Sequence, residues 1–253
     1  MAGFLGMGSA KAGKGVKKEE QEKKRFFQFF DLYFRKFWKL VKLNLLFILF
    51  CIPIITIGPA TAAMMKIVRY YNEEKPVFLF SDFLSAFKQN FAQSFVVSII
   101  DAILVAGCVQ GFLYYMVKFY AGNGWFIIPV IILVILSVVL IFANFYIFLV
   151  IVTVDLKLIA VIKNSVMFMF IGARTNFLTF IFVMAIAIPC FLLFPFSVPV
   201  LILIAFSTIA MIVCFNSFQY IYKFLVKPYY DQSGLENPYE KDYDTEVIFQ
   251  DRT

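Results

Sequence analysis

Histidine is missing from this 253-residue sequence, and charged residues make up only 15% of it. Without histidine, the chain lacks both the commonest general base and the commonest metal ligand of proteins. The motifs of ATP-binding loops, serine hydrolases and zinc proteases are absent, as are paired carboxylates at catalytic spacing. We therefore expect a protein that is not an enzyme and needs neither a cofactor nor a metal.

Cysteine is also sparse, and no two cysteines have the CxxC spacing of redox or metal sites. The four are isolated inside apolar runs, at Cys51, Cys108, Cys190 and Cys214. Cysteine in such surroundings acts as a small hydrophobic side chain. We expect all four to be packing residues.

Apolar residues are what the chain has in excess, at 62% of its length. Their runs reach or exceed the ~20 residues that a bilayer-spanning helix needs. The sequence thus predicts an all-α polytopic membrane protein with a membrane domain at 26–230, between a disordered basic tail at 1–25 and an acidic tail at 231–253. The expected spans are 38–57, 59–74, 91–118, 126–153, 176–195 and 199–222.

A proline- and glycine-containing break organises the stretch 43–64. Pro53 should kink the first span, because it removes one helical hydrogen bond. Gly58 permits a sharp turn, and Pro59 suits the first turn of the next helix. That helix is short, so by length alone it fits a re-entrant element as well as a span.

The distribution of basic residues favours a crossing by the short helix, since Lys and Arg accumulate on the inner side of a membrane. If it crosses, 22 of the 23 Lys and Arg residues are inside and Lys118 alone is outside. If the first span is kept and the short helix does not cross, eleven of them move outside. We therefore predict six membrane helices with both termini inside and the corner at Gly58–Pro59 facing outward.

The segment just before the first span has the pattern of an amphipathic helix. Aromatic residues recur at helical spacing within 26–37, with basic residues between and beside them. This pattern indicates a helix lying in the inner headgroup layer, and Trp38 would then anchor the start of the span. A longer, tilted first helix fits the same residues equally well.

Asp101 is the residue that most suggests function within the spans. A carboxylate about ten residues into a span is costly in lipid and is a functional hypothesis by default. On the six-span topology Lys66 or Arg69 would reach its depth, forming either a buried ion pair that fixes packing or a proton- or ligand-coupled site. Amides such as Asn44 and Asn144 either join helices by hydrogen bonds or contribute to the same polar site.

The stretch 53–63, PIITIGPATAA, resembles the YesL-like bacterial membrane family of unknown function. Asn44 in the first span, the Asp82-Phe83 pair and the Lys163-Asn164 pair contribute to the resemblance, which extends over roughly 26–230. It implies a multi-pass protein of a Gram-positive bacterial cell membrane, of a kind often encoded beside sugar ABC importers. The family has no established catalytic or binding residues, so it adds none here.

Together these features predict a non-enzymatic protein that assists carbohydrate uptake by associating with a sugar ABC importer. An independent small-molecule transporter using the intramembrane polar residues is the alternative, and a membrane sensor is a third. The expected partners are anionic lipid headgroups and importer subunits, and not nucleic acid, because the basic residues lie beside membrane segments.

Overall fold

The computed structural model describes residues 25–234, and all regular structure in this range is helical. Four helical segments are long and apolar enough to cross a membrane. They are Phe91–Tyr120, Gly124–Ile151, Ala173–Leu192 and Val198–Ser233. They match the last four apolar runs of the sequence, which confirms the prediction of an all-helical, multi-pass architecture. The predicted tails fall outside the described residues, except for residue 25 and residues 231–234.

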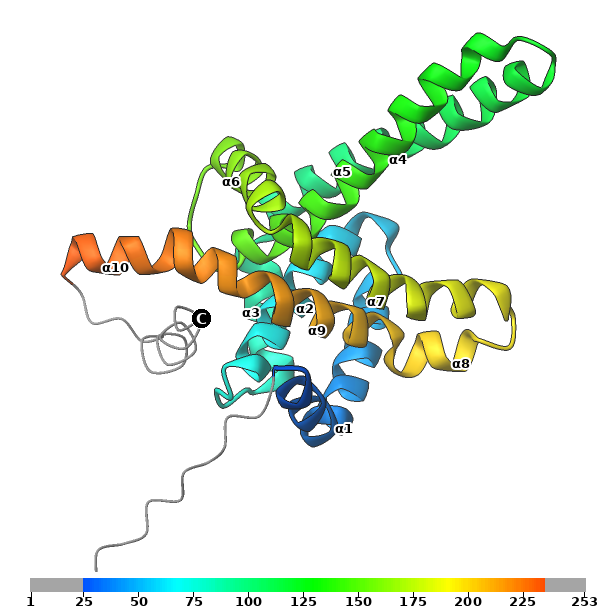
Figure 1. Cartoon of the computed structure of the whole chain (residues 1–253). Helices are drawn as coiled ribbons and strands as arrows, with labels where there is room; N and C mark the ends of the chain where they lie inside the picture. The colour runs from blue at the N-terminus through cyan, green and yellow to red at the C-terminus, as the bar shows by residue number, and fades with distance from the viewer. Residues whose placement is uncertain (1–24, 235–253) are drawn as a thin grey trace, which may run out of the picture.

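Two antiparallel hairpins carry these four segments. The first pairs α4 (Phe91–Tyr120) with α5 (Ile127–Ile151), and Figure 1 shows it projecting well away from the rest of the molecule. The second pairs α7 (Ala173–Leu192) with the helical run containing α9 (Phe206–Ile221). Each hairpin therefore has a tip and a base, which define where the remaining elements lie.

The remaining elements are shorter. They are η1 (Ile54–Thr56), α2 (Ile57–Asn72), α3 (Leu79–Gln89), η2 (Gly124–Phe126), α6 (Leu158–Ile171), α8 (Val198–Val200), η3 (Leu201–Ala205), η4 (Tyr222–Val226) and α10 (Lys227–Ser233). Both η3 and η4 are π-helical turns inside the run that contains α9. That run is therefore one long rod with two wide turns in it.

The N-terminal helix α1 (Arg25–Cys51) is continuous, so the amphipathic stretch 26–37 and the apolar stretch after it form one element. No turn therefore separates the two stretches. The chain leaves α1 at Cys51, and Pro53 lies in the following break instead of kinking the helix. The Thr56 hydroxyl stabilises this break by donating to the Phe50 and Pro53 carbonyls, at 2.5 and 2.6 Å.

Helix α2 lies across the base of the α4–α5 hairpin. At its start, Gly58 fits so closely against α4 that a Cβ there would lie 2.6 Å from Ser98 Cβ. Near its end, Arg69 Nη1 donates to the Val152 carbonyl just after α5, at 3.3 Å. Because the beginning of α4 and the end of α5 share one end of their hairpin, both ends of α2 lie at that base.

This position differs from the outward-facing corner expected at Gly58–Pro59. With 16 residues, α2 is about 24 Å long, shorter than a hydrocarbon layer of about 30 Å. The end of α1 lies at the base as well, because the Phe50 ring is 5.1 Å from that of Phe87, shortly before α4 begins. Neither α1 nor α2 is among the four helical segments suited to cross a membrane.

The packed core of the molecule centres on α2. Most residues of this short helix are buried, although α4, α5 and α7 leave most of their apolar surface exposed. Helices α1, α3, α4, α5 and α9 all contact α2. A helix buried on all sides is typical of a protein interior, so α2 is the element around which the other helices are arranged.

Candidate functional site

A side-chain hydrogen bond between Asp101 of α4 and Asn144 of α5 joins these two helices. The Asn144 amide donates to the carboxylate of Asp101 at 3.2 Å and also to the Leu140 carbonyl at 3.1 Å. Both residues are partly buried. Of the five intramembrane polar residues predicted to act together, this is the pair that hydrogen bonds directly in the described structure.

The Lys66 side chain contacts α3 and not Asp101. Its ammonium group donates to the side-chain carbonyl of Gln89 at the end of α3, at 3.1 Å. This contact ties α2 to α3 at the base of the hairpin. An Asp101–Lys66 ion pair, one of the arrangements that the sequence suggested, is not formed in the described structure.

Asn44 joins two helical segments by hydrogen bonds, which is one of the two roles that the sequence suggested for it. Its amide is fully buried and donates to the Leu201 and Ile202 carbonyls, at 2.9 and 2.7 Å. Its side-chain oxygen accepts from the backbone N–H of Ser207 at 2.8 Å. A π-turn disturbs the regular helical hydrogen bonds, and Asn44 satisfies the backbone groups of η3 while fixing α1 to it.

The strongest concentration of buried charge is at the end of α2. The side chains of Arg69 and Glu73 are 5% and 0% exposed, and Arg69 Nε lies 3.5 Å from Glu73 Oε1. Lys75 Nζ lies 2.7 Å from the other oxygen of the same carboxylate. The Arg69 guanidinium also stands over the Phe218 ring of α9, 5.7 Å from its centre. Arg69 therefore pairs with Glu73, a residue that sequence reasoning missed.

A buried amide adjoins this ion pair. Both polar atoms of the Asn72 side chain are buried without a hydrogen bond of normal geometry to any described residue. The Asn72 amide lies beside the Cys214 thiol of α9. Since buried amides are almost always hydrogen bonded, this corner has unused capacity to bind water or a small polar group.

A second buried network connects α5, α7 and α9. The Tyr146 hydroxyl donates to the Asn176 side-chain oxygen at 2.7 Å, and the Asn176 amide donates to the Met169 carbonyl at 3.0 Å. Nearby, the hydroxyls of Thr175 and Tyr220 lie 2.7 Å apart. The sequence did not indicate this network, because none of these residues is charged and they come from apolar segments far apart in the chain.

The chemistry of these groups is that of structural polar networks. Among residues 25–234, no group of three or more Cys, Asp or Glu side chains is placed to hold a metal ion. The buried carboxylate of Glu73 is neutralised by two cations, and the hydroxyls of the Tyr146 network are occupied by amides and one another. The arrangement is able to fix helices, and the Asn72 side chain leaves two buried polar atoms without a hydrogen bond of normal geometry to a described residue.

Residues 40–114 match the sequence profile of a family described as "Protein of unknown function, DUF624". The matched segment extends from α1 through α2 and α3 into α4, so it includes the break after α1, the Arg69–Glu73 pair and Asp101. Neither a curated protein nor a solved structure matches the chain significantly.

Proposed function

We propose that this chain is a non-enzymatic, multi-pass membrane protein that works through protein contacts on one side of the membrane, as an accessory to carbohydrate uptake. One observation carries the proposal. The polar residues that would have formed an intramembrane transport site have separate structural partners: Asn144 for Asp101, Gln89 for Lys66 and Glu73 for Arg69. Buried charge is concentrated instead at the base of the hairpins.

The proposed topology has four spans. The two hairpins cross the membrane. Helices α2, α3 and α6 lie at the base of the α4–α5 hairpin and form what we term the base layer. Helix α1 packs along the α7–α9 hairpin, with Phe29 beside Phe215 and Asn44 bonded to η3 near the hairpin tip. Both ends of α2 lie at the base of the α4–α5 hairpin, as does the end of α1, which supports this arrangement. The tip of the α4–α5 hairpin then faces the opposite side.

The distribution of basic residues agrees with four spans as well as with six. Removing the crossings of α1 and α2 together leaves every later loop on the side that it had before. The base layer and both termini then lie inside with 22 of the 23 Lys and Arg residues, while Lys118 lies outside. We take the inner side to be the cytoplasm of a bacterial cell.

The base layer offers a surface to a partner. Phe78 and Phe80, at the start of α3, are 78% and 61% exposed, although they precede the first span and lie among polar residues. Exposed apolar residues outside the membrane-spanning segments are typical of protein interaction sites. Lys88 at the other end of α3 is also exposed. A sugar ABC importer is the partner that the family resemblance suggests.

Affinity purification from native membranes in mild detergent, followed by mass spectrometry, tests the proposal. We expect the wild-type chain to recover an ABC permease or a sugar-binding protein. A Phe78→Ser/Phe80→Ser variant should lose it. Trp125→Ser is the matched control, since Trp125 is 85% exposed at the tip of the α4–α5 hairpin. Recovery of no importer subunit by the wild type would count against the proposed role.

Independent transport is the second candidate, and the buried polar atoms of the Asn72 side chain, which have no hydrogen bond of normal geometry to a described residue, favour it. In this case the purified chain alone, in proteoliposomes, would move a small polar solute, and Asn72→Leu would abolish the flux. Solute movement without any importer subunit would favour this second function over the accessory role.

A further inference from the structure

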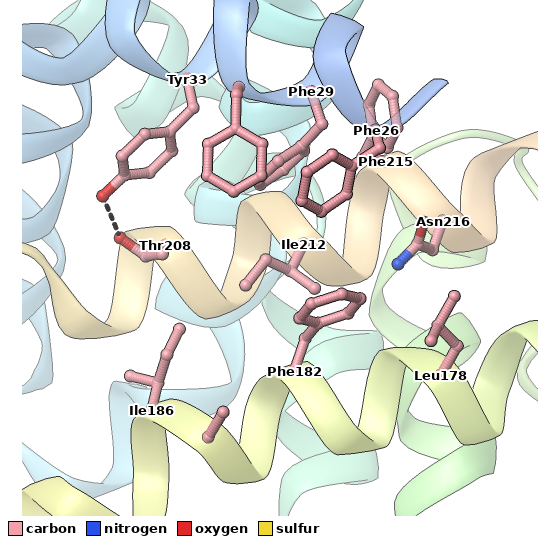
Figure 2. Close-up of a pocket in the computed structure, with 12 residues that line it drawn as sticks. Phe26, Phe29, Tyr33, Leu178, Phe182, Ile186, Thr208, Ile212, Phe215 and Asn216 are labelled. Carbon is pink, nitrogen blue, oxygen red and sulfur yellow. Dashed lines mark hydrogen bonds between the residues drawn. The ribbon is translucent and has the colours of Figure 1, made fainter. Parts of the chain in front are cut away.

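An apolar groove of about 450 Å³ lies between the N-terminal part of α1, helix α7 and helix α9. Figure 2 shows the rings of Phe26 and Phe29 from α1 beside Phe215 from α9, with Phe182 of α7 facing them. The size is within the range of small-molecule sites, which is about 300–1,000 Å³. The walls belong to three different helices and are almost entirely hydrocarbon.

The two ends of the groove differ. One is marked by Tyr33 and Thr208, whose hydroxyls are 3.0 Å apart and hydrogen bonded to each other. The other is marked by Asn216 of α9 and Leu178 of α7 (Figure 2). Since the first two hydroxyls satisfy each other, that end offers little to a polar ligand. A polar group of a ligand would sit at the end marked by Asn216.

Helical register places two cations beyond this end of the groove, one turn from Leu178 on α7 and about two turns past Asn216 on the run containing α9. Helices α7 and α9 meet there through the bond between the Thr175 and Tyr220 hydroxyls. Arg174 directly precedes Thr175, and Lys223 follows Tyr220 by three residues; both are exposed. Arg174 is one helical turn from Leu178, so it is on the face of α7 that lines the groove. On the proposed topology this end lies at the inner membrane surface.

We propose that the groove binds one acyl chain of an anionic phospholipid, with the headgroup phosphate at Arg174 and Lys223. An apolar channel that ends at two cations is complementary to an anionic amphiphile and not to a neutral one. A helix with side chains, about 10 Å or more across, is too bulky for a groove of this volume. This inference goes beyond the accessory role and does not depend on the partner.

Native mass spectrometry of the full-length chain tests the proposal, after delipidation and the addition of phosphatidylglycerol or phosphatidylcholine with identical acyl chains. Wild type should retain one phosphatidylglycerol in preference to phosphatidylcholine. Ala185→Trp, which fills the groove from α7, should lose this bound lipid. Ala106→Trp is the matched control, because Ala106 is exposed on α4 and does not line the groove.

The double variant Arg174→Gln/Lys223→Gln tests the headgroup contact without touching the core, since both side chains are exposed. It should still bind lipid but lose about 30-fold of its preference for phosphatidylglycerol, given the usual contribution of each basic residue near an anionic surface. An unchanged preference would overturn the headgroup assignment. Equal lipid retention by Ala185→Trp and Ala106→Trp would overturn the groove as the binding site.

Discussion

Arg69 and Glu73 carry the largest electrostatic cost in the described structure, because both side chains are almost entirely removed from solvent. A buried charge is tolerated when it is paired and hydrogen bonded. Arg69 has the Glu73 carboxylate, the Val152 carbonyl and the Phe218 ring as partners. The pair thereby links α2 to α5 and α9, so it stabilises the packing of the base layer against these two helices.

Glu73→Gln should therefore destabilise the protein strongly. It leaves the Arg69 charge buried without a counter-ion, which typically costs about 3–5 kcal/mol. The matched control is Glu74→Gln. The neighbouring Glu74 pairs with Arg35, but the two side chains are 56% and 52% exposed, so a loss of about 1 kcal/mol or less is expected. Denaturant titration in detergent measures the free energy of unfolding of both variants. Equal losses of stability would contradict a stabilising role of the Arg69–Glu73 pair.

The sequence analysis did not predict the pairing of Arg69 with Glu73. It placed Arg69 and Lys66 at the depth of Asp101, because the distribution of basic residues favoured a crossing by the short helix. The structure turns α2 across the hairpin base, so Arg69 meets the carboxylate one turn later on its own helix. Helical i, i+4 spacing was the signal that could have identified Glu73.

At the scale of elements, composition was enough to identify the four long segments. Runs of more than 18 apolar residues are distinctive, and those beginning at residues 91, 126, 176 and 199 correspond closely to the observed helices. The same reasoning assigned α1 and α2 as spans too, although neither is among the four segments long and apolar enough to cross a membrane. A helix buried in protein is as apolar as one buried in lipid. The length of α2, 16 residues, was more informative, because it is shorter than a typical bilayer-spanning helix.

Gly58 decides how closely α2 can approach α4. A Cβ at this position would lie 2.5 Å from Ser98 Oγ, so Gly58→Ala must push the two helices apart. Overpacking of this kind typically costs about 1–3 kcal/mol. Gly107→Ala is the matched control, since nothing lies within 4 Å of an added Cβ there. Thermal unfolding in detergent should show a lower melting temperature for Gly58→Ala alone.

Asn44 shows why local sequence reasoning stops short of tertiary structure. A lone amide in an apolar helix predicts a hydrogen bond between helices, and the structure contains one. Its partners, the carbonyls of Leu201 and Ile202 in η3, are on an element 157 residues away in the chain. Nothing in the sequence around 201–205 indicates a π-turn, so the partner could not be found without the fold.

At the scale of the whole molecule, the distribution of basic residues does not fix the number of membrane crossings. It reveals an odd number of wrongly assigned crossings, because these place all later loops on the wrong side of the membrane. It cannot detect a pair, such as the presumed crossings of α1 and α2, because the two inversions cancel. Contacts at the base of the α4–α5 hairpin are independent of charge, and they are the observations on which the four-span proposal rests.

Cysteine labelling distinguishes the two topologies. In a background with the four native cysteines replaced by alanine, Ile55→Cys places a thiol in the break between α1 and α2, where Ile55 is 64% exposed. With four spans, a membrane-impermeant maleimide should label it only after permeabilisation. With six spans, it should react in intact cells. Asn123→Cys at the hairpin tip should be labelled in intact cells either way, and Gln89→Cys should not be. Labelling of Ile55→Cys in intact cells would restore the outward-facing corner, and the base layer would then have to span the membrane.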